Sequence, residues 1–200
     1  MATVLDMSMS LDGFVAGPNT GPGNGLGDGG ERLHEWLEIG SGGHEDVGLQ
    51  AGVNRQVFDE LMATGAVVAG RGTFEPAGGW NGDHHDGVPI FIVARDELGI
   101  DVSDWPLVSV VPDVATALGE ANRAAGEKDV LVHGAAEITR LALAAGMLDW
   151  ISIHLVPILL GGGRRLIDVI DGGQVDLQRV QVLEGENGVT HLRYRVEKRL

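Results

Sequence analysis

Two short apolar segments that end at glycine are the strongest constraint on how this chain folds. Residues 66–69 lead into Gly70-Arg71-Gly72-Thr73, and residues 130–132 lead into His133-Gly134-Ala135-Ala136-Glu137. A short strand that stops at glycine and opens into a helix or turn points several backbone N–H groups in one direction, and this arrangement suits a phosphate group. Two such points in one chain predict a long ligand with several phosphates, such as a dinucleotide.

Apolar strands alternate with amphipathic helices, which favours a largely parallel sheet with helices on both faces. The expected strands cover residues 3–11, 66–69, 89–94, 107–111, 130–133 and 151–160, and the expected helices cover residues 31–39, 50–64, 113–126 and 136–145. A short helical stretch is expected after Gly163. Asn187-Gly188 is a strong turn signal between strands at 175–183 and 189–197, which adds an antiparallel hairpin. The length predicts one α/β domain over residues 1–200.

The composition excludes several classes of function. The chain has no cysteine, which removes disulfides and thiolate metal sites and agrees with a cytoplasmic location. Its formal net charge of -15 opposes binding to nucleic acid and anionic membranes. The N-terminus does not resemble a signal peptide, and the longest apolar run, residues 151–160, is too short to span a bilayer. His44-Glu45-Asp46 and His84-His85-Asp86 are expected to be solvated loops rather than metal sites, and His154 is expected at the edge of the core.

Two arginines directly follow predicted core strands. Arg71 lies in the first glycine motif, and Arg95 follows Ala94 at the end of the strand expected over residues 89–94. Open α/β sheets bind ligands at the carboxyl ends of their strands, so both guanidiniums are candidates to bind phosphate. The alternatives are a tight turn with an exposed arginine at Arg71 and a solvated surface arginine at Arg95. At Gly134 the alternative is close packing of a helix on the sheet.

Residues 17–30 are rich in glycine and follow the first expected strand and its short continuation. One interpretation is a flexible surface loop. The other is a lid over a bound ligand, because long loops inside compact domains are often functional. The position of the loop favours the lid.

Five segments in register, at residues 7–16, 70–75, 132–136, 146–149 and 156–163, read MSMSLDGFVA, GRGTFE, VHGAA, GMLD and VPILLGGG. Together they resemble the dihydrofolate reductase-like fold, and in particular the stand-alone form of the reductase domain found at the C-terminal end of bacterial bifunctional riboflavin-biosynthesis enzymes of the RibD type. The resemblance covers nearly the whole chain. It implies a three-layer α/β/α fold with a mixed, mostly parallel central sheet and a C-terminal antiparallel hairpin.

The resemblance also implies NADPH as the cofactor, with no metal. The implied cofactor-binding residues are Ser8, Val15 and Ala16 at the nicotinamide, Gly70, Arg71, Thr73, Ala94 and Arg95 at the phosphates including the 2′-phosphate, and His133, Gly134, Ala135, Ala136 and Glu137 at the pyrophosphate.

The chain departs from the family pattern at two places. The family carries Gly-Gly with a cis peptide bond where this chain has Gly134-Ala135, and a cis bond before alanine costs about 3 kcal/mol. The proton-donating carboxylate of folate reductases has no clear counterpart. Glu35 is the expected donor, with Asp28 and Glu31 as alternatives, and Asp28 and Trp36 are expected to contact the substrate.

The implied reaction is hydride transfer from NADPH to a C=N-type bond of a flat heterocycle, which makes the chain an oxidoreductase acting on CH–NH or C=N groups. The expected substrate is the phosphoribosylamino-uracil intermediate of riboflavin biosynthesis, and dihydrofolate or a pterin is the alternative. A non-catalytic NADP-binding module is a further alternative. Residues 151–160 and the hairpin are candidate surfaces for a homodimer, although burial inside the monomer is the simpler account.

Overall fold

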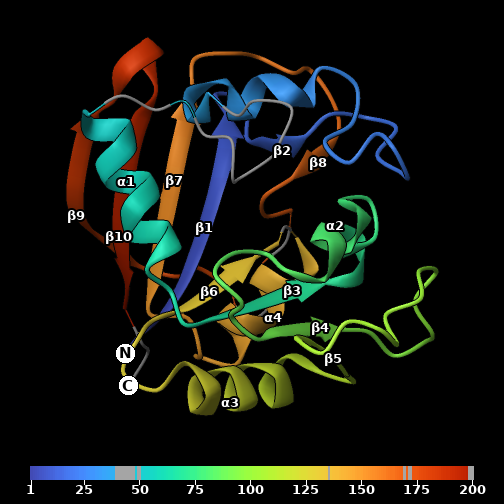
Figure 1. Cartoon of the computed structure of the whole chain (residues 1–200). Coiled ribbons are helices and arrows are strands. Elements are labelled where there is room, and N and C mark those ends of the chain that lie inside the picture. Colours follow the sequence, from blue (N-terminus) through green and yellow to red (C-terminus); the bar gives the residue numbers. More distant parts are fainter. Residues whose placement is uncertain (39–47, 49–50, 135, 169, 171–172, 198–200) are drawn as a thin grey trace.

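The computed structural model describes residues 1–38, 48, 51–134, 136–168, 170 and 173–197, and one long sheet runs through it (Figure 1). Neighbouring strands are parallel from β5 (Val108–Val111) across to β7 (Trp150–Val156), while β10 (Thr190–Val196) is antiparallel to both β7 and β9 (Leu177–Glu184). The predicted mostly parallel sheet with a closing hairpin is confirmed. In spatial order the strands are β5 (Val108–Val111), β4 (Ile90–Val93), β3 (Ala66–Gly70), β6 (Val130–His133), β1 (Thr3–Ser10), β7 (Trp150–Val156), β10 (Thr190–Val196) and β9 (Leu177–Glu184).

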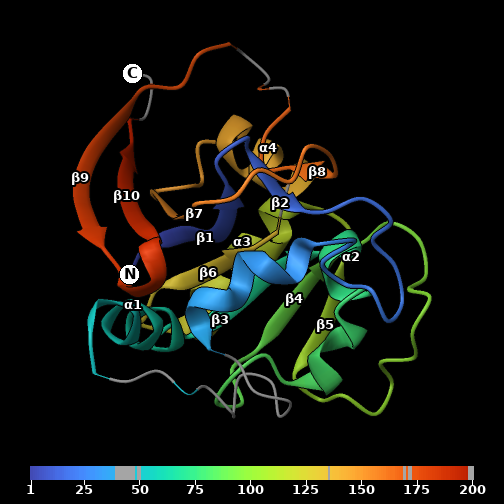
Figure 2. The same cartoon turned by 90° about the horizontal axis from the view of Figure 1, so that it is seen from above.

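Helices cover both faces of this sheet and give the three layers that the sequence predicts. Figure 2 shows α1 (Val53–Met62) and α4 (Glu137–Ala144) on opposite sides of β1 and β7. On the α1 side, Leu33 and Phe58 pack with Val156 in one apolar cluster. No helix of the described residues is long and apolar enough to cross a membrane. One face carries α3 (Val114–Ala125) and α4 (Glu137–Ala144), and the other carries α1 (Val53–Met62) and the 3-10 helix η1 (Gly30–Leu37).

The chain between β7 and β9 differs from the sequence prediction. β7 ends at Val156 instead of residue 160, because Pro157 has no N–H to donate to a neighbouring strand. The helical stretch expected after Gly163 is wrong: Arg164–Arg165 form strand β8, which pairs antiparallel with β2 (Phe14–Ala16). Gly163 has a φ of 120°, outside the helical region, so the chain turns toward β2 there.

The expectation that His84 and His85 are solvated is also wrong, since only 4% and 5% of these residues is exposed. Trp80, in the 3-10 helix η3 (Gly78–Gly82), packs edge-on against His84 with ring centroids 4.7 Å apart. His85 Nε2 lies 3.2 Å from Thr64 Oγ1, and burial lowers the pKa of His85. In the described ranges no cluster of three or more histidine or acidic side chains could hold a metal, and residues 44–46 lie outside those ranges.

A chain of buried polar side chains crosses the sheet beneath η1. Asn54 Nδ2 donates to the carbonyl oxygen of Trp36 at 3.1 Å, so Asn54 Oδ1 accepts from His191 Nε2 at 3.0 Å. His191 Nδ1 then accepts from His154 Nδ1 at 2.8 Å, and His154 Nε2 lies 2.8 Å from Asp6 Oδ1. His154 is 2% exposed and is therefore a core residue.

Acid should destabilise the protein through His191. Burial, together with the neighbouring His154, lowers the pKa of His191 from 6.5 to about 4. Between these values the unfolded chain binds a proton that the folded protein does not bind, so stability falls as the pH drops through this range. The expected loss is about 2–3 kcal/mol between about pH 7 and about pH 4.5, measured by urea unfolding at both values. The loss should be smaller by this amount in His191→Gln, and an equal loss in both proteins would contradict the role of His191.

Candidate functional site

The tips of three neighbouring parallel strands form one wall of a cleft. Gly70 of β3 lies beside Val93 of β4, and Val93 lies beside Val111 of β5, so the residues that follow these strands meet at one edge of the sheet. The cleft there has a volume of about 680 Å³, within the range of small-molecule sites. It brings together seven of the predicted cofactor residues, namely Gly70, Arg71, Thr73, Ala94, Arg95, Ala136 and Glu137.

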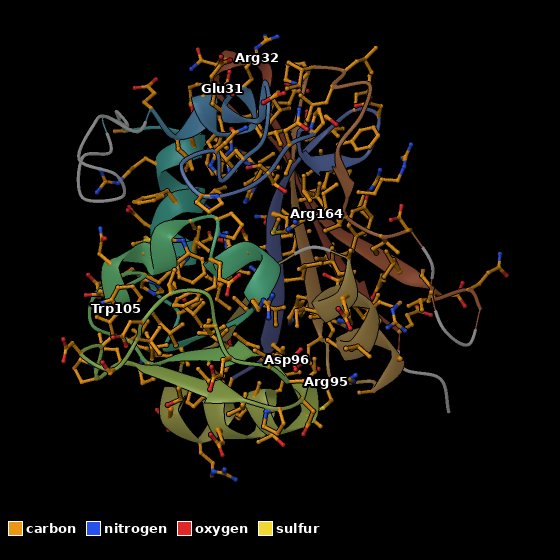
Figure 3. All side chains as sticks on the ribbon, turned by 90° about the vertical axis from the view of Figure 1, so that its right-hand side faces the viewer. Glu31, Arg32, Arg95, Asp96, Trp105 and Arg164 are labelled. Atoms are coloured by element: carbon orange, nitrogen blue, oxygen red, sulfur yellow. The ribbon has the colours of Figure 1, made fainter. Side chains whose placement is uncertain are left out.

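Three guanidinium groups line this cleft. Arg71 begins the short helix α2 (Arg71–Phe74), Arg95 follows β4, and Arg164 comes from β8. Arg71 Nε lies 3.4 Å from Glu75 Oε2, and Arg71 Nη1 donates to the carbonyl oxygen of Glu97 at 3.4 Å. Figure 3 shows Arg164 on the same side of the molecule as Arg95 and apart from it. Planar guanidinium groups with several donors suit phosphate oxygens.

Asp113 is an acidic residue of the cleft wall with a structural role. Its carboxylate accepts hydrogen bonds from the Thr116 backbone N–H at 2.8 Å and from the Thr116 hydroxyl at 2.9 Å, which caps α3. These hydrogen bonds lower the pKa of Asp113, and the positive charge of Arg95 contributes less. The cap therefore holds the beginning of α3 at the cleft as part of its wall.

Gly70 and Gly134 allow α4 to approach β3 closely. A Cβ on Gly70 would lie 2.8 Å from Ile138 Cγ1, and a Cβ on Gly134 would lie 3.4 Å from Thr73 Oγ1. Packing of α4 on the sheet therefore requires a glycine at position 70. At Gly134, where close packing is the alternative interpretation, the 3.4 Å contact is an ordinary one and leaves room for a side chain. The same closeness places the Thr73 hydroxyl next to Gly134, and the two glycine motifs meet at one place.

The N-terminus of α4 faces the cleft, and Ala136, its N-cap residue, makes no side-chain cap. Ala136 N donates to the carbonyl oxygen of Leu166 at 2.8 Å, and Thr139 Oγ1 donates to the carbonyl oxygen of Gly134 at 2.9 Å. The partial positive charge of an uncapped helix N-terminus favours an anion. Ala135 and its bond to Gly134 lie outside the described residues.

The residues predicted at the nicotinamide form a separate, buried group with Trp36, which is predicted at the substrate. Ser8 Oγ accepts a hydrogen bond from Trp36 Nε1 at 2.9 Å, and both residues are buried, as are Val15 and Ala16. None of these four described residues lines the cleft. Ala16 is the connection between the two regions, because it pairs with Arg164 in the β2–β8 ladder.

His133 does not line the cleft either. Its ring centroid lies 5.3 Å from that of His84 and 5.8 Å from that of Trp80. These rings lie over the face of β3 and β6 that is opposite to α4, because Trp80 packs with Val67 and Leu131, whereas α4 packs with Val68 and Val132. A contact between His133 and a cofactor therefore stays a prediction.

The three carboxylates predicted as proton donors lie outside the cleft. Glu35 is exposed, and its Oε1 lies 3.5 Å from Arg32 Nε. Asp28 accepts hydrogen bonds from two asparagine amides of its own loop, at 2.7 and 2.9 Å. Glu31 is exposed on η1, and Figure 3 shows it at the opposite end of the molecule from Arg95. The identity of the donor stays a prediction.

The glycine-rich residues 17–30 fold back on themselves and touch the cleft through one side chain. Gly17 N donates to the carbonyl oxygen of Leu26, and Asp28 N donates to that of Pro18, both at 2.8 Å. Arg164 Nη2 donates to Thr20 Oγ1 at 3.3 Å. This contact with a residue of the cleft supports the interpretation of the loop as a lid.

Sequence reasoning missed Arg164. The available signal was its position directly after Gly161-Gly162-Gly163, a glycine-marked end of an apolar run like the two that the sequence analysis starts from. The β2–β8 pairing that brings Arg164 to the cleft joins residues about 150 positions apart, and no local sequence pattern indicates such a pairing.

The chain matches the family model described as the RibD C-terminal domain over residues 2–191. No curated protein matches it. Among solved structures, one described as a riboflavin biosynthesis protein from Shewanella sp. PV-4 has a TM-score of 0.70 and 19% identity, covering 99% of this chain and 100% of that chain. A pyrimidine reductase-like protein from Corynebacterium diphtheriae has a TM-score of 0.62 and 16% identity, covering 99% and 92%.

Dihydrofolate reductase from Enterococcus faecalis, solved in complex with NADP(H), is also similar, with a TM-score of 0.57 and 12% identity over 98% of this chain and 97% of that chain. At these identities the likeness is one of fold. The predicted dihydrofolate reductase-like fold is therefore confirmed.

Proposed function

We propose that this chain, which belongs to the RibD C-terminal domain family and is therefore a reductase, uses NADPH to reduce a C=N-type bond. The proposed substrate is the phosphoribosylamino-uracil intermediate of riboflavin biosynthesis, and the proposed location is the cytoplasm. One observation carries the cofactor assignment. Three guanidiniums and the uncapped N-terminus of α4 line a single cleft of about 680 Å³ at the ends of β3, β4 and β5.

The donors of this cleft fit a dinucleotide with three phosphates. Arg71 and Arg95 offer charge-assisted hydrogen bonds to the 2′-phosphate, and the Thr73 hydroxyl and the start of α4 offer neutral donors to the bridging phosphates. When bound, NADPH supplies the hydride. The chain contributes binding, orientation and exclusion of water.

A non-catalytic NADP-binding module is the second candidate. The observation that favours it is the position of Glu35, Asp28 and Glu31 outside the cleft, which leaves the proton donor unassigned. Dihydrofolate remains the alternative substrate of the reductase. Both alternatives keep the phosphate-binding residues and differ in the chemistry.

The test combines a binding and a turnover measurement. NADPH is titrated by calorimetry, and the loss of its absorbance is then followed with the phosphoribosylamino-uracil or with dihydrofolate. Turnover of the first supports the proposal, and turnover of dihydrofolate alone favours the alternative substrate. Binding without turnover of either favours the binding module. Absence of binding by any nicotinamide nucleotide would overturn the proposal.

Replacing Arg71 or Arg95 with alanine should weaken NADPH binding by about 10- to 100-fold, since a charge-assisted hydrogen bond is worth about 1.5–3 kcal/mol. NADH lacks the 2′-phosphate, so its affinity should change by less than about 3-fold. Titration of both nucleotides against each variant measures the difference.

Arg55→Ala is the matched control, because Arg55 is paired with Asp59 on α1 and does not line the cleft. It should leave both affinities unchanged. Equal losses for NADPH and NADH in Arg71→Ala and Arg95→Ala would refute the 2′-phosphate role.

A homodimer is also part of this proposal. β7 lies between β1 and β10, with Ile151 and Ile153 each 5% exposed, so burial within the monomer accounts for residues 151–156. In the edge strand β9, by contrast, Val180 and Val182 are 43% and 47% exposed. An apolar edge strand favours association with another chain, and β9 is therefore the candidate surface.

A further inference from the structure

Arg164 lies where three segments of the candidate site meet. Its Nη1 donates to the carbonyl oxygen of Gly72 at 2.7 Å, and its Nη2 donates to Thr20 Oγ1 at 3.3 Å. Its backbone pairs with Ala16 of β2. The half-buried guanidinium therefore touches the first phosphate motif and the glycine-rich loop, and it lines the same cleft as the start of α4.

The charge of Arg164 lacks an anionic partner among the residues that the structure describes. Both oxygens that it contacts are neutral, and no described carboxylate lies within 4.0 Å. The adjacent Arg165 differs, because its Nε lies 3.9 Å from Asp168 Oδ1 and its guanidinium lies 4.4 Å from the centre of the Phe14 ring. In a chain with 29 acidic and 14 basic residues, a half-buried cation that faces a cleft without a carboxylate is suited to an anionic ligand.

The position of Arg164 indicates which anion it meets. Arg71 reaches toward the segment after β4, where its Nη1 meets the carbonyl oxygen of Glu97. Arg164 approaches from the other side, from the strand that pairs with Ala16 at the predicted nicotinamide end. Figure 3 shows Arg164 and Arg95 as separate points on this side of the molecule. In a dinucleotide the bridging diphosphate lies between the nicotinamide and the 2′-phosphate, and Arg164 lies between the residues proposed for those two ends.

We propose that Arg164 binds the bridging diphosphate of the nicotinamide cofactor, exchanging its contact with Thr20 for a phosphate oxygen while it keeps the Gly72 carbonyl. This inference rests on the proposed function and adds a residue to it. A phosphate oxygen replaces a neutral hydroxyl as the acceptor, which strengthens the hydrogen bond. Arrival of the cofactor thereby releases the one side-chain contact described between residues 17–30 and Arg164.

The test compares three probes in Arg164→Gln and in the wild type. NADPH and NADH both contain the bridging diphosphate, whereas adenosine 2′,5′-bisphosphate contains the 2′-phosphate without it. Arg164→Gln should weaken NADPH and NADH equally, by about 10- to 100-fold, and change the affinity of adenosine 2′,5′-bisphosphate by less than about 3-fold. Arg71→Ala should show the opposite pattern, with NADPH and adenosine 2′,5′-bisphosphate weakened and NADH unaffected.

Arg165→Gln is the matched control, since it removes the same charge from the next residue, which does not line the cleft, and it should leave all three affinities within about 3-fold of the wild type. Arg164→Lys keeps the charge but loses the planar fork, and it should show an intermediate, equal loss for NADPH and NADH. If Arg164→Gln does not fold, the affinities of Arg164→Lys for the same three probes provide the test. Unchanged affinities in the folded Arg164 variants, or a loss confined to NADPH, would overturn the role of Arg164 alone. A wild-type protein that binds none of the probes would overturn the proposed function as well.

Discussion

Asp6→Ala is expected to lower the free energy of unfolding by about 1–3 kcal/mol, because removing one partner of a buried hydrogen bond leaves the other partner buried and unsatisfied. The Asp6 side chain is 11% exposed and that of His154 is 2% exposed. The loss of stability extends beyond one contact, since His154 is hydrogen-bonded to His191, and His191 to Asn54. This series of hydrogen bonds joins β1, β7, β10 and α1. Urea unfolding at about pH 7 measures the change.

Asp59→Ala is the control for this variant. Asp59 also pairs with a cation, with Arg55 Nε at 2.8 Å from its Oδ1, but its side chain is 56% exposed. A solvated pair on a helix contributes about 0.3–0.5 kcal/mol. Asp6→Asn should recover part of the loss, since an amide can donate to His154 Nε2. If Asp6→Ala costs no more than Asp59→Ala, the buried contact between Asp6 and His154 does not stabilise the fold.

Gly163→Ala is the second variant with a large expected effect. A Cβ at this position would overlap with the carbonyl oxygen of Ala16, and the φ of 120° is one that alanine rarely adopts. Steric overlap and backbone strain together should cost about 2–5 kcal/mol. Because Gly163 directly precedes β8, the affinity for NADPH should fall as well. Urea unfolding and a nucleotide titration measure the two effects.

The neighbouring glycine provides the control for Gly163→Ala. A Cβ on Gly162 would have open space around it, with nothing within 4 Å. Gly162→Ala should therefore change the stability by less than about 1 kcal/mol and leave nucleotide binding intact. Similar losses in both variants would show that the segment responds to any side chain, and not to the overlap with Ala16.

The alternation of strands and helices could be predicted from the sequence because each element carries its own pattern. The buried strands β3 and β6 are continuous apolar runs, and Asp113 caps α3 as predicted. Leu33, Trp36 and Leu37 share the buried face of η1, also as predicted. Elements with a periodic apolar face or a recognisable cap are specified locally, and these were placed correctly.

The misses have a different origin. β8 contains two arginines and no apolar residue, so nothing in its sequence indicates a strand, and its partner β2 lies about 150 residues earlier. Glu35 was placed at the site because it is next to Trp36. Trp36 faces inward at 2% exposed, and this turns its neighbour outward to solvent. His84 and His85 lie in a polar stretch, and they are buried because Trp80 packs against His84, while His85 lies against His84 and Thr64.

The order of the strands bears on how the protein is made. β1 holds residues 3–10, yet its two neighbours in the sheet are β6 and β7, with Thr3 beside Val130 and Val4 beside Trp150 (Figure 1). During translation β1 therefore stays without its partners until β6, about 120 residues later in the chain, has left the ribosome. Such late, non-local pairing slows folding, and it leaves apolar side chains and an unpaired strand edge exposed to aggregation. This chain is therefore expected to depend on chaperones as it emerges, and to refold slowly from denaturant.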